Sequence, residues 1–194
     1  MIAIVKYNAG NIRSVENALK RLNAACVISD DPTVLKSADK LILPGVGEAS
    51  SAMAYLKQKG LDTFIKQRTK PTLGICLGLQ LFCSYSEEGN TPCLGIFDEQ
   101  VKKFPPRYKV PHMGWNEIID LKGPLFNEVK TNSDLYFVHS YYAEVGPDTV
   151  AACDYIQPFS AALARDNFYA TQFHPEKSAA VGEQILSNFL KLNV

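Results

Sequence analysis

The first half of this chain alternates short apolar runs with segments of helical periodicity, an order that few architectures accommodate. The apolar runs predict buried strands at residues 2–5, 25–29, 40–45 (stopped by Pro44) and 72–75. Helical patterns are expected at residues 48–59 and 77–85, and Asp31-Pro32 is expected to open a turn or short helix. Asn11 can cap a further helix, whose apolar stripe is Ile12, Val15, Leu19 and Leu22. This βαβα order predicts an α/β fold with a parallel sheet covered by helices on both faces.

The second half is mostly strand-like and ends in a helix at 179–192. Strand patterns are expected at residues 94–97, 101–104, 115–121, 135–145, 149–155 and 160–173, the last with a hairpin turn at Asp166-Asn167. The Pro-rich segment 105–112 predicts an exposed loop. We therefore expect a mostly parallel, mixed sheet with antiparallel strands added late, in a single domain spanning residues 1–194.

Charge and cysteine content exclude several classes of protein. Lys+Arg and Asp+Glu number 20 each, which gives no electrostatic case for binding nucleic acid or an anionic membrane. We find no apolar span of transmembrane length, and the first residues do not resemble a signal peptide. The five cysteines include no CxxC pair, so neither a disulfide framework nor a zinc site is expected. A cytoplasmic location, with no metal and no cofactor, is the expectation.

One cysteine, Cys76, lies between two glycines where the strand pattern gives way to a helix. Gly74-Ile75-Cys76-Leu77-Gly78 has the G-x-nucleophile-x-G form of a nucleophile elbow, a tight turn that needs glycine neighbours. A thiol there stands at a helix N-terminus, where the dipole and free N–H groups favour the reactive thiolate. A buried core thiol is the alternative, but the glycines favour a nucleophile.

A thiol nucleophile needs a base, and the chain has three histidines. His112 lies in the Pro-rich segment, His139 in a strand-like run, and His174 at the end of a strand. In extended backbone, residues two apart point the same way, so Glu176 can orient the ring of His174 as in a triad. A strand end with a solvated carboxylate is the alternative for this segment.

The segment Pro44–Gly47 follows a predicted strand and contains glycine at two positions. It is not a dinucleotide fingerprint, because Ser50 occupies the third glycine position. Gly45 and Gly47 would allow the Val46 N–H to turn toward an oxyanion beside the elbow. An ordinary Pro-Gly turn explains the pattern equally well.

Together, these motifs resemble those of the class I (triad) glutamine amidotransferases, which have a flavodoxin-like fold. Within that class the chain is similar to the family of glutaminase subunits of imidazole glycerol phosphate synthases. The resemblance covers nearly the whole chain and rests on the segments YNAGNIRSV, PGVG, GICLGLQLF, PHMGWN, YFVHSYY and QFHPEKS.

The resemblance implies a role for each motif residue. Cys76 attacks the side-chain amide of glutamine, His174 moves the proton, and Glu176 holds His174. The N–H groups of Val46 and Leu77 would form the oxyanion hole. As a hypothesis on regulation, we expect the glycine-flanked Val46 peptide to rest with its N–H turned away until a partner binds with its ligand. The implied substrate-binding residues are Gly45, Gly47, Gln80, Glu88, Ser140 and Tyr141. For Gln80 and Glu88, the alternative is that they are ordinary polar side chains exposed to solvent.

The family also implies a partner. Its members form a heterodimer with a (β/α)₈-barrel cyclase, which receives the ammonia and makes imidazole glycerol phosphate and AICAR phosphate in histidine biosynthesis. Asn11, Trp115, Tyr136 and Lys177 match interface positions. Core packing is the alternative for the two aromatic residues, and a solvated charge for Lys177.

Three other functions remain possible. The chain could be the amidotransferase subunit of anthranilate or aminodeoxychorismate synthase, which PHMGWN disfavours. It could be a stand-alone cysteine hydrolase or peptidase, which the Pro-Glu after His174 makes a poorer match. A non-catalytic binding module is the third, against which Cys76, His174 and Glu176 speak.

Overall fold

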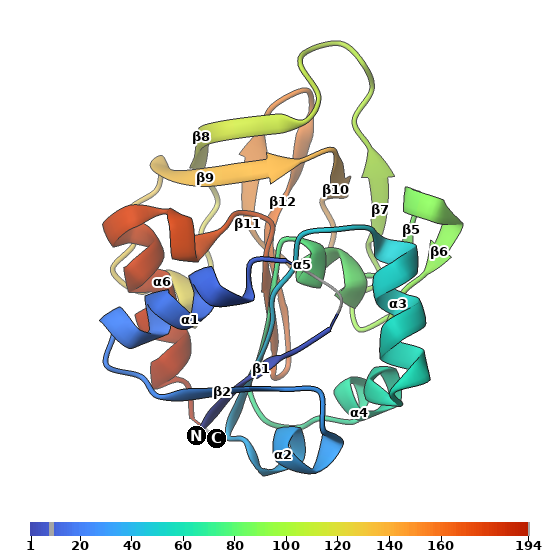
Figure 1. Ribbon diagram of the computed structural model, residues 1–194. Helices are drawn as coiled ribbons and strands as arrows, with labels where there is room; N and C mark the ends of the chain where they lie inside the picture. The colour runs from blue at the N-terminus through green and yellow to red at the C-terminus, as the bar shows by residue number, and fades with distance from the viewer. Residues whose placement is uncertain (8–9, 194) are drawn as a thin grey trace.

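The computed structural model describes residues 1–7 and 10–193, and within them a seven-stranded mixed sheet forms the centre of the fold (Figure 1). The strand order is β11-β12-β13-β4-β3-β1-β2. The strands that run parallel are β1 (Ile2–Val5), β2 (Cys26–Ser29), β3 (Lys40–Leu43), β4 (Thr72–Ile75) and β13 (Phe168–Thr171). Antiparallel pairing adds β12 (Pro158–Arg165) and β11 (Thr149–Asp154), and Asp166-Asn167 joins β12 to β13. The expected mixed sheet is confirmed.

Helices cover both faces of this sheet, as predicted. On one face lie α1 (Ile12–Arg21) and α6 (Ala179–Lys191). On the other lie α2 (Pro32–Ser37), α3 (Ala49–Gln58), α4 (Leu61–Lys66) and α5 (Leu77–Phe82). None of the helices formed by the described residues is both long and apolar enough to cross a membrane.

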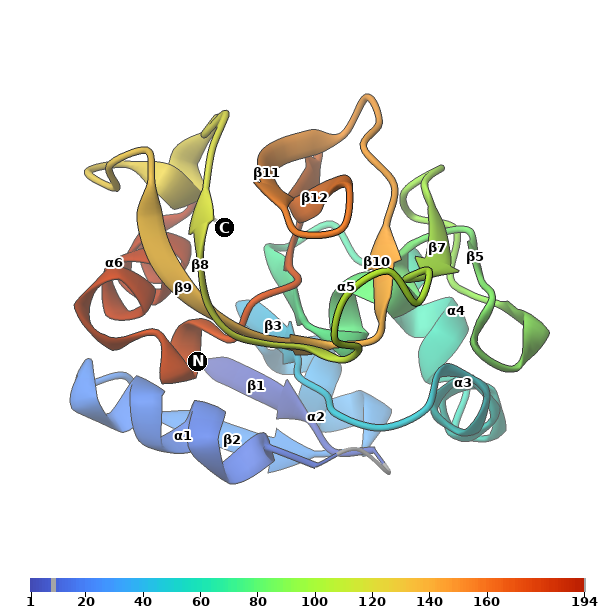
Figure 2. The ribbon, with the colours of Figure 1, turned by 90° about the horizontal axis from the view of Figure 1, so that it is seen from above.

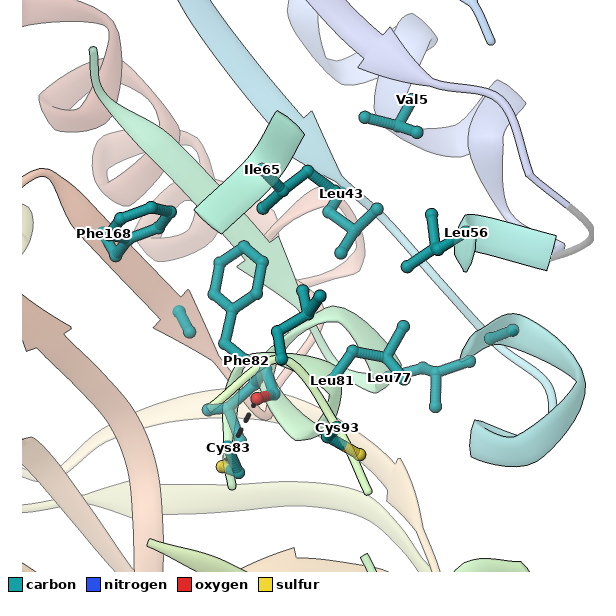
Figure 3. Packing of buried hydrophobic residues seen from close by; sticks show 14 of the residues in the cluster. Val5, Leu43, Leu56, Ile65, Leu77, Leu81, Phe82, Cys83, Cys93 and Phe168 are labelled. Carbon is teal, nitrogen blue, oxygen red and sulfur yellow. Dashed lines mark hydrogen bonds between the residues drawn. The ribbon is translucent and has the colours of Figure 1, made fainter. Parts of the chain in front are cut away.

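The strand residues alternate between the two cores, because successive side chains of a strand point to opposite faces. Leu41 and Leu43 pack into the core beneath α3–α5, whereas Ile42 packs into the core beneath α1 and α6. In the first core the ring of Phe82 meets that of Phe168 edge-on at 5.7 Å (Figure 3). Both faces of the sheet are therefore buried, which explains the uninterrupted apolar runs of its parallel strands.

Two smaller sheets flank the carboxyl edge of the main sheet. One pairs β8 (His112–Ile118) with β9 (Ser133–His139), and the two run side by side from near α6 toward α5 (Figure 2). The other, in the order β10-β7-β5-β6, contains β5 (Tyr85–Ser86), β6 (Thr91–Pro92), β7 (Gln100–Lys103) and β10 (Tyr141–Ala143). Short 3₁₀ turns are η1 (Glu88–Asn90), η2 (Pro124–Phe126) and η3 (Pro175–Lys177).

Several expected elements differ from the structure. Residues 94–97 form no strand, because their N–H groups satisfy the last carbonyls of α5: Leu94 N bonds Leu81 O at 2.8 Å, and Ile96 N bonds Phe82 O at 2.8 Å. Helix α5 ends at Phe82 instead of Tyr85, which belongs to β5. The sequence did not suggest the short helix α4. It begins after Gly60, whose backbone is in the left-handed region with φ 66°.

Asn11 occupies the N-cap position of α1 but does not cap the helix with its side chain. Its backbone is left-handed, with φ 73°, and its amide is directed toward Glu176 and His174 instead. Asparagine is one of the few residues that adopts this conformation readily. The residue expected to begin a helix therefore contributes its side chain to the neighbourhood of His174.

Candidate active site

Cys76 stands in a sharp turn between β4 and α5, with the unusual backbone angles φ 53° and ψ −102°. A Cβ added to Gly78 would lie 2.1 Å from the carbonyl oxygen of Leu43, and one on Gly74 would lie 2.7 Å from the Gly78 carbonyl. Neither position tolerates a side chain without movement of the backbone. The glycines flanking Cys76 are therefore required by close packing of the backbone. The sequence pattern predicted a tight turn that needs glycine at these positions.

His174 follows β13, the parallel neighbour of β4, so its ring is held at the same edge of the sheet as Cys76. Its Nδ1 lies 2.7 Å from Glu176 Oε1, and both side chains are fully buried. The carboxylate reaches the ring through the 3₁₀ turn η3. The expected pair is close in space, but a turn brings the two side chains together instead of the extended backbone that was assumed.

The environment of His174 favours the charged ring. Burial alone would lower its pKa, but the Cys76 thiolate and the Glu176 carboxylate outweigh burial and raise the pKa to about 10. Within the described residues the buried Nε2 makes no hydrogen bond of regular geometry. A charged imidazole ring beside a cysteine sulfur can stabilise a thiolate and can give up a proton.

The side chain of Asn11 completes the surroundings of this pair. Its Nδ2 donates a hydrogen bond to Glu176 Oε1 and lies 3.3 Å from His174 Nδ1. Sequence reasoning assigned Asn11 to helix capping and to a partner interface, so this contact was missed. No local signal could have shown it, because 163 residues separate Asn11 from His174.

A cavity of about 260 Å³ opens beside Cys76. Of the residues expected to bind substrate, its walls contain Gly47, Gln80, Glu88, Ser140 and Tyr141, together with Val46 and Leu77 of the expected oxyanion hole. Gly45 does not line the cavity. Its backbone packs against Tyr7 and Leu77, where a Cβ would lie 2.3 Å from the Tyr7 hydroxyl.

Glu88 lies in the cavity wall without a cation beside it among the described residues. Its Oε2 accepts a hydrogen bond of 2.8 Å from Ala49 N at the start of α3. Burial raises its pKa, against the lowering effect of that hydrogen bond, and nearby Glu48 raises it further. A carboxylate in this position favours a ligand that carries a positive charge.

The expected oxyanion hole is closed by the chain itself. Leu77 N donates to the carbonyl oxygen of Gly45 at 3.3 Å. Because the N–H and C=O of a trans peptide point in opposite directions, the Val46 N–H faces away from Leu77. Two further contacts hold this loop, since the Tyr7 hydroxyl donates to Pro44 O and Gly10 N donates to Val46 O at 3.1 Å.

The other two histidines form a buried pair between β8 and β9. His139 Nδ1 lies 2.8 Å from Tyr141 O, an acceptor, so this nitrogen carries the proton and Nε2 is an acceptor. His112 Nδ1, at 3.0 Å, must donate to that Nε2, and Asn116 Nδ2 donates to His112 Nε2 at 3.3 Å. Both rings are neutral, since burial lowers the pKa of His112 to about 4 and that of His139 to about 3.

An aromatic patch crosses the outer face of β8 and β9 near His174. Trp115 is 54% exposed, and its ring meets that of Tyr136 at 6.1 Å, while Lys177 Nζ lies 5.9 Å above the Tyr136 ring. Met113, which sequence reasoning did not single out, is 57% exposed on the same strand as Trp115. Tyr136 O also accepts a hydrogen bond of 2.9 Å from His174 N, so the patch is joined directly to the backbone of His174.

Comparison with known proteins identifies the family. The model for "Glutamine amidotransferase class-I" matches residues 4–192. The imidazole glycerol phosphate synthase subunit HisH of Bacteroides fragilis (strain YCH46) is 61% identical, over 98% of this chain and 99% of that protein. The HisH subunit of Bacteroides thetaiotaomicron is 57% identical over the same shares, and that of Vibrio cholerae is 45% identical over 98% of both chains.

Solved structures show the same fold at lower sequence identity. One glutamine amidotransferase superposes with a TM-score of 0.78 at 18% identity, covering 98% of each chain. Another, from Thermotoga maritima, gives 0.65 at 16% identity, over 97% of this chain and 81% of that one. By the matched family model and the full-length similarity to HisH subunits, this chain belongs to the class I glutamine amidotransferase family, on its HisH branch.

Proposed function

We propose that this chain is the glutaminase subunit of an imidazole glycerol phosphate synthase. It acts as one domain that hydrolyses glutamine to glutamate and ammonia and delivers the ammonia to a cyclase in histidine biosynthesis. The full-length similarity to HisH subunits supports the pathway. The observation that carries the activity is the Cys76 thiol in a strained elbow beside the buried His174–Glu176 pair.

The proposed mechanism uses these groups in two half-reactions. The Cys76 thiolate attacks the amide carbon of glutamine, and the imidazolium of His174 protonates the departing ammonia, which leaves a glutamyl thioester. His174, now neutral, takes a proton from water as that water attacks the thioester, the C–S bond breaks, and glutamate is released while the Cys76 thiolate and the charged ring are regenerated. Glu176 keeps the ring oriented and stabilises its charged form throughout.

Substrate recognition would use the walls of the cavity beside Cys76. Glu88 would pair with the α-ammonium group of glutamine, which would give this carboxylate a positively charged partner. The backbone at Ser140 and Tyr141 would receive the α-carboxylate, and Gln80 would border the bound side chain. Gly45 and Gly47 would serve by letting the Val46 peptide turn.

The closed oxyanion hole supports a regulated glutaminase. When the Val46 peptide rotates, the Gly45 carbonyl leaves Leu77 N and the Val46 N–H turns inward, so that two donors face the developing oxyanion. Losing one such donor costs about 10²–10³ in rate, so the rotation would be a strong switch. A partner that favours the rotated loop would activate the enzyme by shifting this equilibrium.

The partner would be a (β/α)₈-barrel cyclase bound over the aromatic patch. Trp115, Tyr136 and Lys177 would make the contacts, and the bond from His174 N to Tyr136 O would connect them to the active site. Asn11 would act at the border of this interface through its contacts with Glu176 and His174.

The decisive experiment is glutamine turnover by the purified chain, alone and with the cyclase and its ligand. We expect slow turnover alone and an increase of about 10²–10³ with both added, because the second oxyanion donor is then available. Cys76→Ala should abolish turnover, whereas the control Cys26→Ser, on strand β2, should not.

Three outcomes would contradict the proposal. Equal turnover with and without the partner would reject the switch, and turnover by Cys76→Ala would reject the nucleophile. Co-purification with a chorismate-using synthase instead of the barrel cyclase would reject the pathway.

A further inference from the structure

We propose that Gln172 is a further residue of the active site, which donates its side-chain N–H to the Cys76 thiolate and stabilises the sulfur in its attacking form. The inference rests on Cys76 being the nucleophile of the proposed function. Gln172 is fully buried, and its Nε2 lies 3.5 Å from Cys76 Sγ. Hydrogen bonds to an ionised acceptor are stronger than neutral ones, so a donor here favours the thiolate over the thiol.

The position of Gln172 follows from the end of β13. Gln172 follows the last residue of that strand, where its N–H donates to Ala161 O at 2.8 Å, and His174 comes two residues later. Phe173, between them, is fully buried in the core on the sheet face beneath α1 and α6. Gln172 and His174 thus approach the same sulfur from one short segment.

The orientation of the Gln172 amide is set by its neighbours, because the oxygen and nitrogen of an amide have the same shape. Gln80 Nε2 lies 3.0 Å from the carbonyl oxygen of Tyr141, so this atom of Gln80 must be the donating NH₂. The same Nε2 lies 3.1 Å from Gln172 Oε1. A flipped Gln172 would place two NH₂ groups face to face and turn its oxygen toward the thiolate.

The chain of hydrogen bonds continues beyond Gln80. Tyr141 O also accepts from His139 Nδ1, which leaves His139 Nε2 to accept from His112 Nδ1, and His112 Nε2 accepts from Asn116 Nδ2. The hydrogen bonds form two branches. One runs from Gln80 to Gln172 and on to Cys76, and the other runs from Asn116 through His112 and His139 to Tyr141 O. A network of neutral groups therefore holds the Gln172 N–H on the sulfur, without a second positive charge that would compete with His174.

The test is the pH dependence of Cys76 alkylation by iodoacetamide in the full-length chain, followed peptide by peptide so that the other four cysteines are separated. Gln172→Met keeps the length of the side chain and removes the donor. We expect the inflection of the alkylation profile to move to higher pH, and the rate below that inflection to fall roughly tenfold. Gln184→Met on α6 is the matched control and should leave the profile unchanged.

A residue that only fills space would change the plateau rate or the stability, and the inflection would stay in place. That result in folded Gln172→Met would overturn the proposal. If Gln172→Met does not fold, as judged by circular dichroism, Gln172→Asn retracts the same amide by one methylene and should shift the inflection by a smaller amount in the same direction. An unshifted inflection in folded Gln172→Asn would also overturn it.

Alkylation needs no glutamine, so its outcome is separate from that of the proposed function. A shifted inflection in a chain that does not hydrolyse glutamine would uphold the role of Gln172 and reject the glutaminase. An unshifted inflection in an active glutaminase would do the reverse.

Discussion

Two buried histidine sites lie close together in this molecule, and one favours a charged ring whereas the other favours neutral rings. His174 is fully buried, yet its pKa is raised to about 10. His112 and His139 are 3% and 5% exposed, and their pKa values are lowered to about 4 and 3. Burial disfavours the charged ring at all three positions, so burial does not explain the difference.

The partners of each ring explain it. His174 faces the Cys76 thiolate and the Glu176 carboxylate, two negative charges that outweigh the cost of burial. The His112–His139 pair has only neutral partners, namely the Tyr141 carbonyl and the Asn116 amide, and protonation would set two N–H groups against each other. The first site therefore favours a charged ring and the second favours neutral rings, and His139 of the second site lines the cavity beside Cys76.

Glu176→Gln should produce the largest effect, because it removes a negative charge from the His174 site and leaves the shape intact. We expect glutamine turnover to fall on the order of 10³–10⁴-fold, with the pKa of His174 shifted toward that of the neutral pair. Turnover and its pH profile are the measurements. Glu183→Gln, which removes an exposed partner of Arg21, is the control. Turnover within tenfold of the original would show that the carboxylate is not what distinguishes the two sites.

Acid should destabilise the fold through the second site. A histidine whose folded pKa lies below its unfolded value stabilises the fold above about pH 6.5, and that stability is lost as pH falls toward the folded value. The two rings together should lower the free energy of unfolding by about 4 kcal/mol between pH 7 and pH 5. Urea unfolding at the two pH values measures this.

His112→Asn removes one titrating ring from the pair, so its stability should fall less steeply over the same range. An unchanged slope would contradict the assignment of acid sensitivity to this site.

His174 has the opposite sign: its raised pKa stabilises the fold fully below about pH 6.5, and this stability is lost as pH rises toward about 10. In Cys76→Ser, the free energy of unfolding should therefore depend less steeply on pH in the alkaline range. Its dependence on pH in the acid range should be unchanged.

The smallest effects come from the asparagine beside each site. Asn11→Gly suits the left-handed backbone and removes the donor to Glu176, so turnover should fall about tenfold with little change in stability. Asn116→Ala removes the donor to His112, so stability should fall by about 1 kcal/mol with little change in turnover. Turnover and urea unfolding on both variants test this crossed pattern. Equal effects of the two variants on turnover would argue against separate roles for the sites.

The sequence by itself determined the features that depend on local spacing. The order of apolar and helical segments predicted the doubly covered sheet, and Gly74 and Gly78 around Cys76 predicted the elbow. His174 and Glu176 were predicted as a pair because they are two residues apart. Each of these follows from periodicity or from a steric demand within a few residues, which a sequence displays directly.

Only the tertiary structure decided which groups meet across the chain. It brought the Gly45 carbonyl to Leu77 N and Asn11 to Glu176, and it paired His112 with His139. It also made residues 94–97, expected as a strand, a segment whose N–H groups bond the last carbonyls of α5. A polar group bonds whichever partner the packed fold brings within reach, and these partners come from distant segments, so no local pattern encodes them.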